Sequence, residues 1–215
     1  YQNILNEAHN RDIIVIAAAG NDDTASQLYP AAYNHVISVA STGFGDTKSS
    51  FSNYGDWIDI SAPGSDIVSA VATNNSAYMY YSGTSMACPN VASLVALMLS
   101  HNPSLSLPEL EHCLYASADN IDGNNPAYAG LLGAGRINAW AALQCVSPTT
   151  CQSPYIFTVN DITSTTATIN WNTIASAANY TLRYKNQNTS AWINLPSTTA
   201  HQMDITGLQA CTIYE

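Results

Sequence analysis

The sequence has little charge and very few cations. Only 9% of its 215 residues are charged, against a usual ~25%. Five Lys and Arg stand against fifteen Asp and Glu, for a formal net charge of −10. Such a chain lacks the basic stripe by which proteins bind nucleic acid, so no nucleic-acid partner is expected. No apolar run reaches the ~18–20 residues that a membrane span needs. The abundance of Asn, Ser and Thr favours an extracellular protein.

The cysteines do not form a closed set of pairs, because there are five of them. Cys145 and Cys151 lie close together and could form a disulfide in an oxidising compartment, although spacing alone never fixes connectivity. The chain opens on Tyr1 rather than Met and stops within an apolar segment. We therefore expect a piece of a longer protein, without a signal peptide of its own.

A change in composition divides the chain into two modules. Residues 1–144 alternate strand-like and helix-like segments, which is typical of an α/β domain with a parallel sheet covered by helices. Residues 145–153 are the expected linker, and 154–215 the second module. The expected helices are 1–11, 84–99, 107–117 and 137–144, and the expected strands are 13–18, 36–40, 57–61, 68–72 and 78–81. The last two strands are separated by a polar turn and predict a hairpin.

The second module contains only short alternating segments, at 167–171, 180–184 and 201–205. Clusters of Asn, Ser and Thr separate them. This pattern predicts a small antiparallel sandwich.

The strongest chemical signal is the run Gly-Thr-Ser-Met-Ala at residues 83–87, which leads into a long helix. A Ser at such a turn exposes its hydroxyl, and the helix N-terminus offers free amides and partial positive charge to a developing anion. Both a nucleophile and an oxyanion donor benefit from this placement. The alternative is that Thr84 or Ser85 only caps the helix, with Pro89 in its first turn.

A second signal is the run Ala-Ala-Ala-Gly-Asn at residues 17–21, which ends an apolar strand. Asn21 can present its amide at the carboxyl edge of the sheet, where open α/β folds build their sites. The alternative is an ordinary Gly-Asn turn.

The two runs, in this order, resemble the subtilisin-like serine proteases (subtilases), most closely the thermitase-like branch. The resemblance continues through Tyr-Pro-Ala-Ala-Tyr at 29–33, Val-Ile-Ser-Val-Ala at 36–40, Ser-Phe-Ser-Asn-Tyr-Gly at 50–55, Ala-Pro-Gly at 62–64 and Gly-Ala-Gly-Arg-Ile-Asn at 133–138. It implies a part of a three-layer, parallel-sheet peptidase domain. One departure is Asn90, where the family usually has a His that is not the catalytic base.

The resemblance also implies roles for particular residues. Ser85 would be the nucleophile that is acylated, and the Asn21 side-chain amide and the Ser85 backbone N–H would form the oxyanion hole. The residues expected to bind protein or peptide substrate are Ala17, Ala18, Ala19, Gly20, Gly83 and Thr84. No cofactor is implied with certainty and no side-chain metal site is expected. The carbonyls of Ala31, Tyr33 and Val36 match a loop that holds a weak Ca²⁺ or monovalent cation in relatives.

The family's catalytic Asp and His precede the Ser in the chain, in Asp-Ser/Thr-Gly and His-Gly-Thr elements. No His of this sequence is followed by Gly-Thr; the five are His9, His35, His101, His112 and His201. Because triad members act as a unit, we expect this chain to be an inactive piece of a secreted, broadly specific serine endopeptidase. The alternative is a non-catalytic extracellular adhesion or binding protein on a degenerate protease fold.

Residues 154–215 resemble the opening strands of a fibronectin type III domain, with the last strands absent. Trp171 would be the core Trp of one sheet, and Tyr214 the Tyr that opens a late strand. The resemblance implies a spacer, or a module that attaches the protein to the extracellular matrix or the cell surface.

Overall fold

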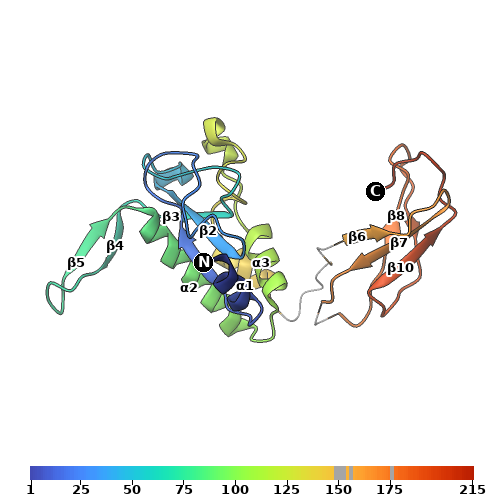
Figure 1. Ribbon diagram of the computed structural model, residues 1–215, viewed down its shortest axis with the longest axis horizontal. Coiled ribbons are helices and arrows are strands. Elements are labelled where there is room, and N and C mark those ends of the chain that lie inside the picture. The colour runs from blue at the N-terminus through green and yellow to red at the C-terminus, as the bar shows by residue number, and fades with distance from the viewer. Residues whose placement is uncertain (148–153, 155–156, 175–176) are drawn as a thin grey trace. The chain divides into compact units, whose positions relative to one another are not determined.

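The computed structural model describes residues 1–147, 154, 157–174 and 177–215 (Figure 1). The chain divides into two compact units, Tyr1–Ser147 and Pro148–Glu215. The first unit thus continues three residues past position 144, because its last helix, α4 (Ala139–Cys145), remains packed on it. Each unit is described by itself.

A three-stranded parallel sheet forms the centre of the first unit. It consists of β1 (Val15–Ala18), β2 (Val36–Thr42) and β3 (Ile60–Pro63), in the order β1-β2-β3. All seven residues of the middle strand are buried, as is usual for strands of parallel sheets. The predicted α/β class is confirmed, although β3 begins at Ile60 rather than at Trp57.

Helix α2 (Thr84–His101) packs against all three strands of this sheet. Its buried positions, which include Val91, Leu94, Val95 and Met98, recur at helical spacing and join the main core. Helices α3 (Leu107–Ala116) and α4 pack on α2. The other elements are α1 (Gln2–His9) and the short helices η1 (Phe44–Asp46), η2 (Asp122–Asn124) and η3 (Pro126–Tyr128). Within the described part of the chain, no helix is both long and apolar enough to cross a membrane.

The predicted hairpin is present as β4 (Ile67–Ala70) and β5 (Tyr78–Tyr81), which pair antiparallel. It extends away from the rest of the first unit in Figure 1, and all four residues of β5 are exposed. The hairpin connects the segment after β3 to the first turn of α2, and therefore to the Gly-Thr-Ser-Met-Ala run.

A disulfide between Cys113 and Cys145 joins α3 to α4. The expectation that Cys145 could pair with Cys151 is therefore wrong, and Cys151 itself lies outside the described residues. The physical reason is tertiary: both helices pack on α2, which brings the two Cα atoms to 5.6 Å across a sequence separation of 32, inside the usual range for a bridge.

The second unit contains an antiparallel sheet in the order β10-β7-β6. Its strands are β6 (Phe157–Asn160), β7 (Thr166–Trp171) and β10 (Gln202–Thr206), and β8 (Arg183–Tyr184) pairs separately with β9 (Ile193–Asn194). The strand expected over 180–184 is limited to its last two residues.

The core of the second unit forms around Trp171, Ile174 and Tyr180. Trp171 is only 7% exposed, which confirms its predicted core position. The Tyr214 hydroxyl accepts a hydrogen bond from the Gln209 backbone N–H at 2.9 Å. A contact between a Tyr hydroxyl and backbone a few residues upstream marks the tyrosine corner of such sandwiches.

Candidate active site

Ser85 lies in the first turn of α2 with an exposed side chain. The N-cap residue is Gly83, which has no side chain to cap the helix, so the alternative in which Thr84 or Ser85 is merely the cap is wrong. Within the described residues, neither the hydroxyl nor the backbone N–H of Ser85 has a hydrogen-bond partner. Both groups are therefore unoccupied at the positive end of the helix.

Asn21 lies directly beside this helix terminus, although it is 63 residues from Thr84 in sequence. Its Oδ1 accepts hydrogen bonds from the Thr84 backbone N–H at 2.8 Å and from the Thr84 hydroxyl at 3.0 Å. A Cβ built on Gly83 would lie 3.8 Å from Asn21 Nδ2. The amide is therefore oriented, with its oxygen held by Thr84 and its N–H donors without a partner among the described residues.

The backbone predicted to bind substrate continues from the end of β1. Ala17 and Ala18 are half-buried, and Ala19 and Gly20 are buried. Gly20 has a φ of +106°, and a Cβ there would lie 2.5 Å from the Asn53 side-chain nitrogen. Glycine is required here because another side chain would be both strained and blocked. The structure thus places this segment and the start of α2 at one edge of the sheet.

Asn53 is a site residue that the sequence reasoning missed. It is 1% exposed, and its side chain donates to the Ala19 carbonyl at 2.9 Å and accepts from the Asp22 N–H at 2.9 Å. Its backbone N–H donates to the Gly20 carbonyl at 3.0 Å. These bonds hold the chain on both sides of Asn21. Asn53 lies in the segment 50–55, which was noted only for its resemblance to the family. The polar Asn in this segment was the only sequence signal for its role.

Thr84 connects the start of α2 to the segment that follows β1. Its hydroxyl accepts from the Gly20 N–H at 3.1 Å while donating to Asn21. We expect Thr84→Val to lower the free energy of unfolding by about 1–3 kcal/mol, because the buried Gly20 donor would lose its partner. Urea denaturation of the 215-residue chain measures this change. Thr84→Ser keeps the hydroxyl and should recover most of the stability; equal losses in both variants would contradict the assignment.

No histidine contacts Ser85 in the described part of the chain. His9 stacks on His35 with ring centroids 3.9 Å apart, His101 bonds the Ser147 hydroxyl, and His201 bonds Thr173. Burial lowers the pKa of His112, which lies on α3. Asn90, at the position of the family's additional His, donates to the Pro63 carbonyl at 2.9 Å and so ties α2 to the end of β3.

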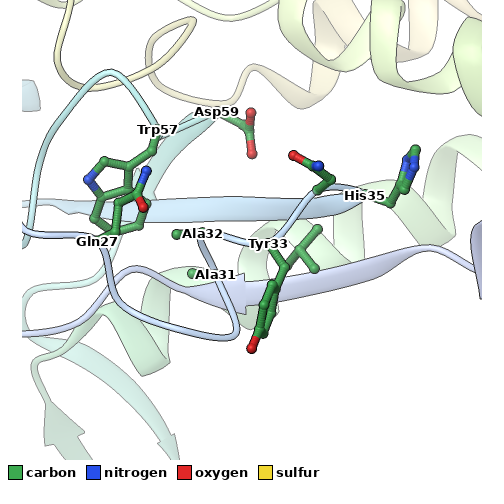
Figure 2. Close-up of a pocket in the computed structure, with 9 residues that line it drawn as sticks. Gln27, Ala31, Ala32, Tyr33, His35, Trp57 and Asp59 are labelled. Atoms are coloured by element: carbon green, nitrogen blue, oxygen red, sulfur yellow. The ribbon is translucent and has the colours of Figure 1, made fainter. Parts of the chain in front are cut away.

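The loop expected to hold a weak cation lines a cavity of about 550 Å³ (Figure 2). Ala31, Tyr33 and Val36 contribute to its wall, together with Asp59. Burial raises the pKa of Asp59, and hydrogen bonds from the Ser38 N–H and hydroxyl, both 2.7 Å to Oδ2, partly offset that rise. Among the described residues, no group of three or more His, Cys, Asp or Glu could hold a metal. A cation here would therefore rest mainly on carbonyl oxygens.

The chain belongs to the subtilase family of serine proteases, whose family model matches residues 1–135. A fibronectin type III model matches residues 152–215. The fold and the pairing of Asn21 with the start of α2 agree with this membership.

Several known proteases are similar to this chain. Thermitase of Thermoactinomyces vulgaris is 43% identical over 143 residues, covering 66% of this chain and 48% of thermitase. The thermophilic serine proteinase of Bacillus sp. (strain AK1) is 42% identical over 142 residues, covering 66% of this chain and 33% of that protein. Among solved structures, a protease from Pseudoalteromonas arctica superposes with a TM-score of 0.62 at 32% identity, covering 68% of this chain and 46% of that one. The chain thus spans a third to a half of these relatives.

Proposed function

We propose that this chain supplies the nucleophile and the oxyanion hole of a secreted serine endopeptidase. The observation that carries the proposal is the orientation of Asn21, whose oxygen is held by Thr84 while its N–H donors remain available beside Ser85. A non-catalytic binding protein has no need for such a donor pair. A 42% identical relative, the extracellular protease of Xanthomonas campestris, supports secretion, as does the Cys113–Cys145 disulfide.

In the proposed reaction, a peptide lies along the backbone of Ala17, Ala18, Ala19 and Gly20, with Gly83 and Thr84 at its reacting end. The Ser85 hydroxyl attacks the scissile carbonyl and loses its proton to a base. The carbonyl oxygen becomes an anion that accepts hydrogen bonds from Asn21 Nδ2 and the Ser85 N–H. The protonated base then gives its proton to the nitrogen of the leaving amine, and collapse of the intermediate expels this amine and leaves an acyl-enzyme, which water hydrolyses.

The base must come from outside this chain, because no described histidine contacts Ser85. We expect the purified 215-residue chain to leave a chromogenic peptide uncleaved, and a longer protease that contains it together with an Asp and a His to cleave that peptide. Ser85→Ala should abolish the activity of the longer protein. Ser93→Ala is the matched control, since Ser93 is an exposed serine on the same helix. Ser85-dependent turnover by the 215-residue chain alone would overturn the proposal of an inactive piece.

We also propose a weak Ca²⁺ or monovalent cation at the carbonyls of Ala31, Tyr33 and Val36, with the Asp59 carboxylate supplying charge. The donor set fits, since carbonyl and carboxylate oxygens are hard ligands and these residues line the same cavity as Asp59. We expect Ca²⁺ to raise the thermal midpoint of the chain, and Asp59→Asn to remove most of that rise. Asp56→Asn, which changes the same charge nearby in sequence, should leave the rise intact; an equal loss in both variants would contradict the site.

A further inference from the structure

The cationic side chains of this protein are nearly all paired with carboxylates. The chain has only five Lys and Arg, all in its described part, against fifteen Asp and Glu. The ion pairs are Arg11 with Glu7, Lys48 with Asp23, Arg136 with Asp46 and Asp119, and Lys185 with Glu215. Arg183 is the exception: within the described residues its guanidinium has neither a carboxylate nor a hydrogen-bond partner.

Arg183 is nevertheless held in place, by an aromatic ring. Its Cζ lies 4.5 Å from the centroid of the Trp192 ring, and the Lys185 Nζ lies 4.8 Å from the same centroid. Tyr184 pairs with Ile193 across β8 and β9, so Arg183, Lys185 and Trp192 share the opposite face of this two-stranded ribbon. Cation–π attraction orients the guanidinium. We call these three residues the cationic patch.

The patch is open to solvent. Trp192 is 40% exposed and Arg183 is also exposed, while Lys185 is partly engaged by Glu215 at 2.7 Å. The second unit carries two of the five cations but only three of the fifteen acidic residues. The strongly acidic first unit repels an acidic ligand, whereas the second unit, with its smaller excess of negative charge, repels it much less.

The chemistry of the patch selects a carboxylate ligand. A guanidinium offers a planar fork of donors that matches a carboxylate in a bidentate pair. A sugar would need the Trp192 ring for stacking, but two cationic groups already lie over that ring. Tryptophan and arginine together are characteristic of the anchoring residues of protein interfaces. We propose that the cationic patch binds an acidic segment of another protein, with a side-chain carboxylate of that segment paired to Arg183.

The proposal assigns the second unit a docking function that does not depend on catalysis by Ser85. Arg183 supplies the directional contact, Lys185 adds charge, and Trp192 keeps both side chains extended on one face. Because Arg183 is already ordered by the ring, less side-chain freedom is lost on binding.

Binding of a fluorescent decaglutamate peptide to the 215-residue chain, followed by anisotropy at low salt, tests this proposal. We expect saturable binding that Arg183→Ala weakens about tenfold and that Trp192→Ala also weakens. Arg183→Lys, which keeps the charge but not the fork, should lie between the wild type and Arg183→Ala. Decaglutamine should not bind. Far-ultraviolet circular dichroism verifies that each variant is folded.

Arg11→Ala is the matched control, because it removes the same charge from an exposed arginine in the first unit. Equal weakening by Arg11→Ala and Arg183→Ala would mean unspecific attraction and would overturn the proposal. Binding of polygalacturonate without binding of decaglutamate would also overturn it, since the patch would then recognise a glycan. Absence of decaglutamate binding to the wild-type chain would do the same, and none of these outcomes bears on the protease proposal.

Discussion

Asn21→Asp is expected to lower kcat by about 10²–10³-fold or more in a protease that contains this chain and supplies the catalytic Asp and His. This magnitude is the one known for removal of the corresponding donor in subtilisin, a member of the same family. Asp keeps an oxygen that accepts from the Thr84 N–H and hydroxyl, so the side chain stays in position. It replaces the free Nδ2 donor with an oxygen, which repels the developing oxyanion.

The effect should fall on kcat and leave KM nearly unchanged, because the lost bond forms only in the transition state. Asn10→Asp introduces the same charge change at the C-terminal end of α1, outside the site, and should be silent. Steady-state kinetics with one chromogenic peptide measures all three proteins. A loss confined to KM, or an unchanged kcat, would remove Asn21 from the oxyanion hole.

The proximity of Asn21 and Ser85 could be predicted from the sequence because it follows from the general geometry of parallel sheets. The carboxyl ends of parallel strands meet at one edge of a sheet, and a helix that starts there presents its amides to the same space. Residues 13–18 identified one strand through a continuous apolar run, and the short segment 36–40 identified a second. Apolar residues at helical spacing over 91–98 identified the helix. Local pattern was sufficient for these elements because each buries a contiguous apolar surface.

The contacts that fix the site in detail were not predictable in this way. Asn53 bonds to the Ala19 and Gly20 carbonyls and to the Asp22 N–H. Because nearly every residue has the same backbone groups, the sequence does not reveal which of them a side chain will bond. Arg183 could be seen as a cation, but only the structure shows that it lacks a carboxylate among the described residues and lies over a Trp ring. Contacts between side chains that are distant in the sequence depend on tertiary packing, and they produce no periodic pattern from which they could be predicted.

The disulfide is the clearest case, and its removal is the second large effect that we expect. Replacing both Cys113 and Cys145 with Ala should lower the free energy of unfolding by about 3–4 kcal/mol, the range expected from loop-closure entropy for a loop of this size, here a sequence separation of 32. Cys113 is fully buried, so the lost sulfur contacts add to the effect. Urea denaturation followed by the far-ultraviolet helical signal reports on the first unit, where helices α1 to α4 lie.

Reduction separates the contribution of the bond from that of packing. A thiol reductant should lower the urea midpoint of the wild-type chain and leave that of the double variant unchanged. Only the wild-type chain has a disulfide whose reduction releases a closed loop in the unfolded state. Cys88→Ala is the matched control: Cys88 is a half-buried free thiol on α2, and its loss should cost much less. If the reductant left the wild-type midpoint unchanged, the bond between α3 and α4 would contribute nothing, and their packing on α2 alone would account for the stability of this end of the unit.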